Sequence, residues 1–182
     1  MRIVGGEWRG RPLAAPGDRG IRPTADRTRE SVFNILAHRR SFDGLRVVDL
    51  FAGSGALGIE ALSRGAAFAL FVDISPQSRA LVRENLDALG AGHRGRLFRR
   101  DAASLGEIGT MAPFDLAFAD PPYGMGLAEK AAASLRAGGW LAPGATIVIE
   151  ERQDCLPGAI AGFVLEDSRR FGETAVGFFR PA

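Results

Sequence analysis

The sequence predicts an α/β protein built on a mostly parallel, doubly wound sheet. Two observations lead to this fold class. Apolar, strand-like runs alternate with helix-like segments along most of the chain. Acidic residues follow several of these runs, and an open α/β sheet binds its ligands beyond the carboxyl ends of its strands. The polar residues at these ends are therefore expected to converge on one rim of the sheet.

Composition limits the class of protein. The chain has 182 residues, of which 46% are hydrophobic and 24% charged, which suits one globular domain with a short appendage. No apolar run approaches the ~18 residues that a membrane-spanning helix needs, and the first residues lack the apolar segment of a signal peptide. We therefore expect a cytoplasmic protein. A single cysteine, Cys155, and only two histidines exclude a disulfide framework and a zinc cluster, so no metal is expected.

The first 40 residues form a basic amino-terminal extension, and residues 41–182 form the main domain. The extension holds nine arginines and four acidic residues. Residues 3–13 predict a short strand pair or extended arm, and a helix is expected from an N-cap at Thr24 or Asp26 to about Arg39. Guanidinium groups suit phosphate contacts, although a solvated surface is the alternative. The candidate RNA-binding residues are Arg9, Arg11, Arg22, Arg27 and Arg29.

A glycine-rich turn follows the first strand of the main domain, which begins at Arg46. Gly53, Gly55 and Gly58 have the G-x-G-x-x-G spacing that lets a backbone approach a ligand and lets the next helix, 56–64, pack on the sheet. Asp49 lies at the end of this strand, where a carboxylate would favour a cationic ligand. Its alternative role is that of a hydrogen-bonded aspartate at a strand end.

The second and third strands also end in aspartates. Strand 68–72 leads to Asp73, twenty residues after Gly53, where an acidic residue accepts hydrogen bonds from ribose hydroxyls. Ser75 and the proline after it predict the start of a helix that ends at Gly90. Strand 96–100 leads to Asp101, which could accept from an adenine amino group or cap the next helix.

The fourth strand, 114–119, ends in the sequence Asp120-Pro121-Pro122-Tyr123. Paired prolines donate no backbone hydrogen bonds and stiffen the chain. The Asp120 carboxylate and the Pro121 carbonyl could together hold an NH2 group, and the ring of Tyr123 could stack on a base. A rigid turn without a ligand is the alternative.

The rest of the chain completes the sheet. A helix is expected over 127–137, followed by a fifth strand over 145–149 that ends in two glutamates. Segments 163–170 and 174–180 are strand-like and flank a short turn with a glycine, so they should form an antiparallel hairpin on the sheet edge.

The two motifs, 49–55 and 120–123, together resemble those of S-adenosylmethionine-dependent methyltransferases that modify exocyclic amino groups of bases. The segments 5–10, 22–24, 26–27, 29–30 and 33–34 are similar to those of the bacterial RsmD family, which methylates N2 of one guanine in small-subunit ribosomal RNA. The resemblance implies a Rossmann-like, seven-stranded class I methyltransferase sheet with a carboxyl-terminal antiparallel hairpin. Asp73 departs from the family pattern, which often has glutamate at this position.

The resemblance also implies a site, a cofactor and partners. S-adenosylmethionine would contact the first three strand ends, and the catalytic residues would follow the fourth. The substrate would be guanine 966 of 16S ribosomal RNA, in an assembling or assembled small subunit, and the protein would be a monomer. The implied residues are Asp49, Phe51, Ala52, Gly53, Ser54, Gly55, Asp73, Ile74, Asp101 and Ala102 for the cofactor, and Asp120, Pro121, Pro122 and Tyr123 for catalysis.

Three other functions fit parts of the sequence. A different base-amino methyltransferase acting on RNA or DNA would use the same motifs. An NAD-dependent oxidoreductase shares the glycine spacing and Asp73, but it leaves Asp49, the 120–123 motif and the basic extension unexplained. A non-catalytic RNA-binding module accounts for the extension and not for the acidic rim.

Overall fold

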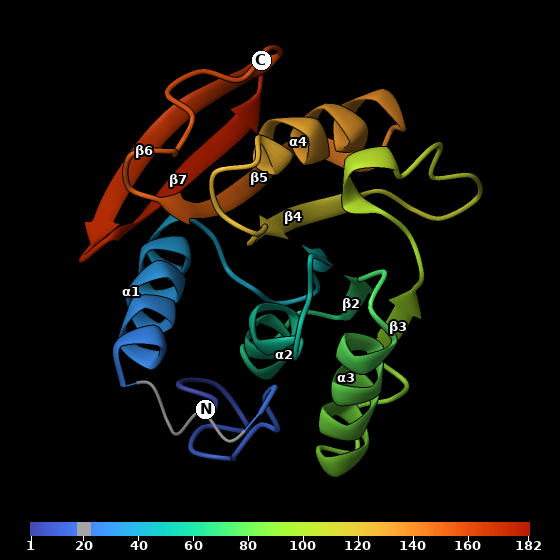
Figure 1. Cartoon of the computed structure of the whole chain (residues 1–182). Helices are drawn as coiled ribbons and strands as arrows, with labels where there is room; N and C mark the ends of the chain where they lie inside the picture. Colours follow the sequence, from blue (N-terminus) through green and yellow to red (C-terminus); the bar gives the residue numbers. More distant parts are fainter. Residues whose placement is uncertain (18–22) are drawn as a thin grey trace.

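The computed structural model describes residues 1–17 and 23–182 and contains a seven-stranded sheet between two layers of helices (Figure 1). The strand order is β3-β2-β1-β4-β5-β7-β6. In chain order the elements are α1 (Pro23–Arg39), β1 (Arg46–Leu50), α2 (Ala56–Ser63), β2 (Phe68–Val72), α3 (Pro76–Ala88), β3 (Gly95–Phe98), the short 3-10 helix η1 (Ala102–Ser104), β4 (Phe114–Ala119), α4 (Leu127–Ala137), β5 (Leu141–Arg152), β6 (Phe163–Phe171) and β7 (Thr174–Pro181).

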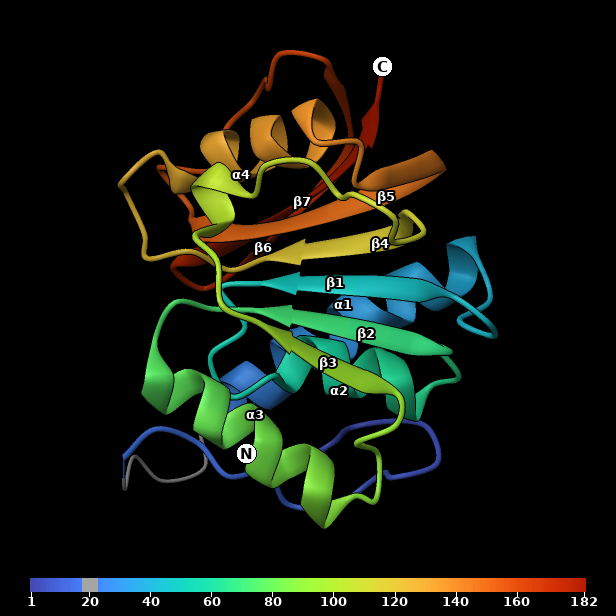
Figure 2. The same ribbon diagram turned by 90° about the vertical axis from the view of Figure 1, so that its right-hand side faces the viewer.

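The strand pairing confirms the predicted fold class. β1 lies at the centre and pairs in parallel with β2 and β4 (Figure 2). β3 and β5 extend the parallel part on either side. β7 runs antiparallel to both β5 and β6, so β6 forms the edge of the sheet. The order reverses direction between β1 and β4, which is where an open α/β sheet presents its ligand crevice.

The hydrophobic core divides into two clusters because side chains alternate across the sheet. Val47 of β1 packs with residues of α1, α2 and α3 on one face. Its neighbour Val48 packs with residues of α4 and η1 on the other. Both valines are fully buried. The helices therefore cover both faces of the sheet, as a parallel sheet requires.

Several element boundaries correct the predictions. The amino-terminal strand pair is reduced to a single bridge between Arg2 and Pro12. α1 begins at Pro23, so Thr24 and Asp26 lie in its first turn and neither is its N-cap. Proline suits the first helical position because it has no N–H to leave unpaired. β5 begins before residue 145 and continues beyond 149, and β3 ends before residue 99.

The amino-terminal arm is fixed to α2 by a buried ionic cluster around Glu60. Glu60 is fully buried and accepts hydrogen bonds from the Val4 backbone N–H and the Arg64 guanidinium, each at 2.9 Å. The Arg29 guanidinium lies 3.7 Å from Glu60 and donates a 2.9 Å bond to Asp26. The arm and α1 therefore pack on the same core as the rest of the chain, and the division at residue 40 stays a prediction.

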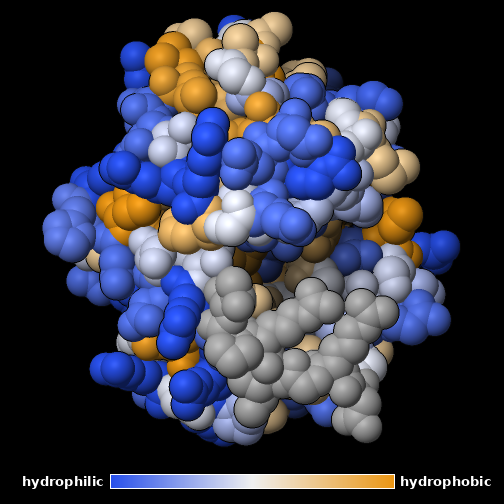
Figure 3. All heavy atoms as spheres, turned by 60° about the vertical axis from the view of Figure 1, so that its left-hand side comes forward, coloured by the Kyte–Doolittle hydropathy of each residue, from blue (hydrophilic) through white to orange (hydrophobic). Residues whose placement is uncertain are grey.

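The surface carries few large apolar side chains. The face in Figure 3 is mostly hydrophilic, with small separate hydrophobic areas. Within the described ranges, 1–17 and 23–182, no helix has the length and apolarity to span a membrane. The exposed large apolar residues are Ile74, Tyr123, Met125 and Val164, and the first three follow the carboxyl ends of β2 and β4.

Candidate active site

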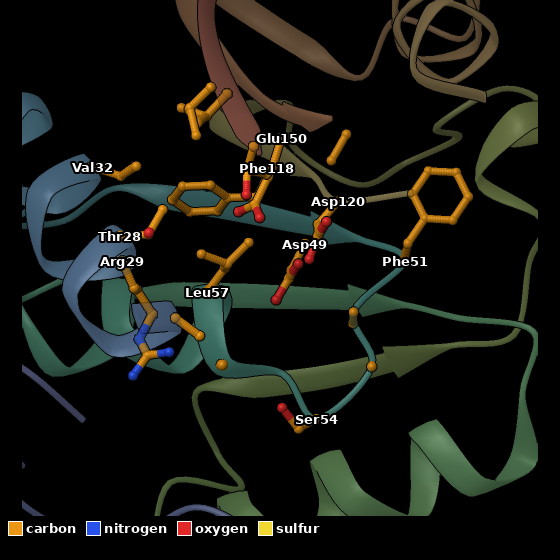
Figure 4. A pocket seen from close by; sticks show the side chains of 18 of the residues that line it. Thr28, Arg29, Val32, Asp49, Phe51, Ser54, Leu57, Phe118, Asp120 and Glu150 are labelled. Carbon is orange, nitrogen blue, oxygen red and sulfur yellow. The ribbon is translucent and has the colours of Figure 1, made fainter. Parts of the chain in front are cut away.

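A cavity of about 430 Å³ lies between the strand ends of β1, β4 and β5, the glycine turn and the first turns of α1 (Figure 4). Residues from both motifs that the sequence singled out line this cavity. Residues of α1 and β7 form the walls that the sequence did not predict. The lining comprises Met1, Pro16, Ala25, Thr28, Arg29, Val32, Asp49, Phe51, Ala52, Gly53, Ser54, Ala56, Leu57, Phe118, Ala119, Asp120, Tyr123, Val148, Glu150, Thr174 and Val176.

Two glycines of the glycine turn have different roles, one next to the space for a ligand and the other in the packing of the helix. Gly53 has a φ of 55°, and a Cβ added there would meet no atom closer than 3.9 Å, so its outer side is open. A Cβ on Gly58 would lie 2.4 Å from the Phe71 ring and 3.2 Å from the Asp49 carboxylate. Gly58 is therefore needed for α2 to pack on β2, and Gly53 leaves space for a bound molecule.

Phe51 adopts φ 57°, the only positive φ of a non-glycine residue in the described part of the chain. A bulky residue in this left-handed region costs of order 1 to 3 kcal/mol and is maintained by its surroundings. Its position directly after β1 turns the chain away from the sheet, and its ring lines the cavity. The strained turn shapes the rim next to Asp49.

Asp49 is both a structural and a cavity residue. Its side chain accepts a 2.9 Å hydrogen bond from the Gly58 N–H, and it is only 1% exposed. Burial and, to a smaller extent, the nearby Asp73 carboxylate raise the pKa of the Asp49 carboxyl to about 7, against the opposing effect of the hydrogen bond from Gly58. A cation in the cavity would favour the ionised form of Asp49. The hydrogen-bonded role considered from the sequence is therefore present, and contact of Asp49 with a cationic ligand stays a prediction.

Asp73 lies beside the glycine turn and not on the cavity wall. One carboxylate oxygen accepts from the Gly53 N–H at 3.0 Å, and the other accepts from the Ser75 N–H at 2.8 Å. Each oxygen keeps a further lone pair, so hydrogen bonds to a ligand stay chemically possible. Asp73 thus holds the turn in place and faces the same rim as Asp49.

The loop after β4 is fastened to the end of β5. The Tyr123 hydroxyl donates a 2.9 Å hydrogen bond to Glu150, and the Gly124 N–H donates a 3.0 Å bond to the buried Glu151. Gly124 has a φ of 74°, which favours glycine. These two bonds hold the Tyr123 ring, 43% exposed, at the mouth of the cavity.

Three carboxylates from neighbouring strand ends, those of Asp49, Asp120 and Glu150, face the cavity (Figure 4). Asp120 is exposed to solvent and lines the cavity. The surrounding protein partly removes its carboxyl from water and raises the pKa well above the usual value, and the charges of Glu150, Asp49 and Glu151 raise the pKa further. Burial also raises the pKa of Glu150, against the hydrogen bond from Tyr123 and the charge of Arg29. The cavity therefore favours a cation or a group rich in hydrogen-bond donors.

Other predicted cofactor residues lie away from the cavity. Ile74 is 63% exposed beyond β2. Asp101 caps η1 by accepting a 2.9 Å bond from the Ala103 N–H, and Ala102 is buried in the core around α4. Gly55 precedes α2 in a left-handed conformation behind the open side of the turn. Helix capping is the alternative role that the sequence offers for Asp101, and in the structure Asp101 caps η1.

Of the other predicted catalytic residues, Pro121 is buried and Pro122 exposed, and neither lines the cavity. The structure therefore does not bring the prolines into contact with the cavity as it does Asp120 and Tyr123.

Of the predicted RNA contacts, Arg9, Arg11 and Arg27 are exposed, and Arg22 lies outside the described residues. Arg29 differs from the expectation of an exposed cation. Its side chain is 6% exposed and is held by Asp26 and Glu60, and Figure 4 shows its guanidinium group turned away from the three carboxylates. A buried guanidinium that is already paired with two acidic residues is not available to a phosphate.

The sequence reasoning missed Glu150 and the α1 wall. The described ranges contain no group of three or more histidine, cysteine or acidic residues arranged to hold a metal ion. The groups around the cavity instead suit a cationic nucleoside. These groups are an open glycine turn, an acidic residue beside that turn, and carboxylates on the cavity floor that have no cationic partner among the described residues.

The fold and this site define a class I methyltransferase. Over 100% of this chain and 97% of the other, the structure matches the solved structure titled "Putative methyltransferase yhhF from Escherichia coli", with a TM-score of 0.83 and 35% identity.

The chain belongs to the RsmD family: the family model described as "Conserved hypothetical protein 95" matches residues 1–180. It is 41% identical to "Ribosomal RNA small subunit methyltransferase D" of Escherichia coli (strain K12) over 96% of this chain and 87% of the relative. It is also 35% identical to "Putative rRNA methyltransferase YlbH" of Bacillus subtilis (strain 168), over 99% and 98% of the two chains.

Proposed function

We propose that this protein methylates the exocyclic N2 amino group of a guanine in 16S ribosomal RNA, with S-adenosylmethionine as the methyl donor. The broader activity, S-adenosylmethionine-dependent methylation of ribosomal RNA, rests on membership of the RsmD family and on relatives named as ribosomal RNA methyltransferases. By family resemblance the target is guanine 966, in an assembling or assembled small subunit in the cytoplasm.

The single observation that carries the proposal is one acidic cavity that joins the glycine turn to Asp120 and Tyr123. The cofactor supplies an electrophilic methyl group on a positively charged sulfur. Asp49 lines the cavity beneath the glycine turn, so its carboxylate would stabilise a bound cation. Gly53 leaves room for the ligand, and Asp73 would accept hydrogen bonds from its ribose.

Asp120 would bind and orient the guanine amino group. The lone pair of N2 is delocalised into the ring, which makes the nitrogen a weak nucleophile. A hydrogen bond from N2–H to the Asp120 carboxylate would direct the amino group and favour its nucleophilic form. Because its pKa is raised, the Asp120 carboxylate could also hold the proton that N2 loses. Holding the nitrogen in place makes the reaction effectively unimolecular, an effect worth up to ~7 to 11 kcal/mol.

Tyr123 and the amino-terminal arm would bind the RNA. The exposed Tyr123 ring at the mouth of the cavity could stack on a base that has left its helix. Arg9, Arg11 and Arg27 are exposed on the arm and α1 and could contact phosphates. A methyltransferase for another base amino group, in RNA or DNA, would use the same groups and is the second candidate.

The deciding experiment is mass mapping of 16S ribosomal RNA from a strain without this gene, complemented by wild type or by the Asp120→Ala variant. The proposal predicts one N2-methylguanine that is lost on deletion, restored by wild type and not restored by the variant. A lost methyl group on a different base would support the second candidate. Thermal shift with S-adenosylhomocysteine and with NADH tests the cofactor, since only a ligand of the native state raises the melting temperature.

A further inference from the structure

Glu150 has no role in the reaction as described so far, although it lines the same cavity as Asp120. It lies in β5, whose neighbour in the sheet is β4, and Asp120 directly follows β4. Figure 4 shows both carboxylates directed into the cavity. One oxygen of Glu150, Oε1, accepts the hydrogen bond from the Tyr123 hydroxyl at 2.9 Å. Among the described residues no group donates a hydrogen bond to the second oxygen, Oε2, so this oxygen is available to a bound molecule.

The position of this oxygen is well fixed. Tyr123 holds Glu150 from one side, and the loop that carries Tyr123 is itself held by the bond from Gly124 to the buried Glu151. Arg29, which also lines the cavity, has its guanidinium group engaged by Asp26 and Glu60 and forms no ion pair with Glu150. Among the residues that the structure describes, no cation is paired with these two carboxylates from neighbouring strands.

Two adjacent hydrogen-bond acceptors match guanine better than they match any other standard base. The edge of guanine that carries the N2 amino group presents N2–H and N1–H side by side as donors. Adenine presents a donor at N6 and an acceptor at N1, and cytosine presents a donor at N4 and an acceptor at N3. A carboxylate facing either of these acceptors places two lone pairs against each other. Enzymes read a flipped base through such edge contacts.

We propose that Oε2 of Glu150 accepts a hydrogen bond from guanine N1–H while Asp120 accepts from the N2 amino group, so that Glu150 selects guanine. This assignment rests on the proposed function, because it assumes that N2 of guanine is the methylated atom. Glu150 then acts as a specificity residue, and Tyr123 both stacks on the base and orients Glu150.

The competing explanation is that Glu150 only supports Tyr123. Glu150→Gln separates the two. Its side-chain carbonyl can still accept from Tyr123, but its NH2 group then occupies the place of Oε2 and opposes N1–H. The base 2-aminopurine keeps an amino group at C2 and has an unprotonated N1, which would accept from that NH2 group.

The experiment compares kcat/KM for two 16S RNA substrates. One carries guanine and the other 2-aminopurine at the single methylated position, which mass mapping locates. Wild type should prefer guanine. Glu150→Gln should shift the guanine to 2-aminopurine ratio toward 2-aminopurine by on the order of 10- to 100-fold, the discrimination that good edge contacts provide. Binding of the two RNAs in the presence of S-adenosylhomocysteine should shift in the same direction.

Three controls complete the test. Tyr123→Phe removes the hydroxyl but leaves Glu150, so it should lower the rate on both RNAs and keep the preference for guanine. Glu107→Gln makes the same chemical change at an exposed residue outside the cavity and should match wild type. Glu150→Asp keeps the charge, and it provides a second variant if Glu150→Gln folds poorly: its shorter reach should weaken the preference without favouring 2-aminopurine.

An equal loss on both RNAs in Glu150→Gln would overturn the inference and leave Glu150 as a support for Tyr123. An unchanged ratio would overturn it as well. If wild type fails to methylate N2 of guanine, the proposed function fails and the inference with it, and the wild-type reaction alone reveals that outcome.

Discussion

The substitution Asp49→Asn should change how the stability of the protein depends on pH. Asp49 is almost fully buried, and its pKa is raised to about 7 from 3.8. Asparagine has nearly the same shape, and its side-chain oxygen can still accept the hydrogen bond from the Gly58 N–H. The substitution therefore removes the titration of a buried group while keeping its main contact.

The sign and magnitude follow from linkage. A carboxyl with a raised pKa in the folded state binds its proton more tightly there than in the unfolded chain. Its contribution to stability is complete below the unfolded pKa and is lost as pH rises through the folded pKa. The unfolded carboxyl is already ionised at about pH 6. With a folded pKa of about 7, the free energy of unfolding should fall by about 1.4 kcal/mol between about pH 6 and pH 8 on account of Asp49.

The assay is urea unfolding of the cofactor-free protein at these two pH values. The free energy of unfolding of Asp49→Asn, relative to wild type, should rise by about 1.4 kcal/mol from the lower to the higher pH. Asp101→Asn makes the same chemical change at the exposed cap of η1 and should follow wild type. An equal difference between Asp49→Asn and wild type at both pH values would refute the reasoning, since Asp49 would then not titrate in this range.

Four further predictions concern the site and its support. Asp120→Asn and Asp120→Ala should reduce single-turnover methyl transfer in that order, with a loss on the order of 100-fold for alanine and cofactor binding retained; near-normal transfer by the alanine variant would make Asp120 a turn residue only. Asp73→Ala should weaken cofactor binding by roughly 1 to 3 kcal/mol, because it loses acceptors and frees the Gly53 and Ser75 N–H groups; calorimetry showing wild-type affinity would contradict this. The double variant Arg9→Ala with Arg27→Ala should lower the salt dependence of RNA binding by a slope of about one per lost phosphate contact, with cofactor affinity unchanged, and an unaltered slope would exclude the phosphate role. Glu60→Gln should destabilise the fold by about 3 to 5 kcal/mol in urea unfolding, because it removes the charge that compensates Arg29 and Arg64, and a change under 1 kcal/mol would show that the charge itself is unimportant.

Much of the fold could be predicted from the sequence because its signals are local. β2, β4 and α4 have the predicted boundaries, since apolar runs and flanking glycines or prolines define them. Ser75 caps α3 as predicted by accepting a hydrogen bond from Ser78. The full length of β5 was missed because its first part contains Pro143 and Gly144 and pairs with β4 across a change of register. Tertiary pairing extends this strand where its local composition favours a turn.

The site was predicted as far as strand ends could reveal it. The rule that ligands bind beyond the carboxyl ends of parallel strands predicted that Asp49, Asp73 and Asp120 share one rim. In the structure Asp49 and Asp120 line the cavity and Asp73 holds the glycine turn beside it. The same rule applied to β5 would have indicated Glu150, whose signal was its position after the apolar run 145–149. The burial of Arg29 had no such signal, because it depends on Asp26 and on Glu60, which lies 31 residues further along the chain. Spacing in a sequence does not show which cations the fold will enclose.

The arrangement of charge explains how one small protein could bind a polyanion and yet act on a neutral base. The cavity floor carries carboxylates, while exposed arginines lie on the amino-terminal arm and on α1. A phosphate group is attracted to the arginines and repelled by the carboxylates, so the RNA backbone would stay at the surface. A guanine that leaves its helix carries no charge and presents donors, so the same carboxylates that repel the backbone would bind its edge. The acidic cavity would thus draw in both the cationic cofactor and the donor-rich base and exclude the phosphates that connect that base to its neighbours.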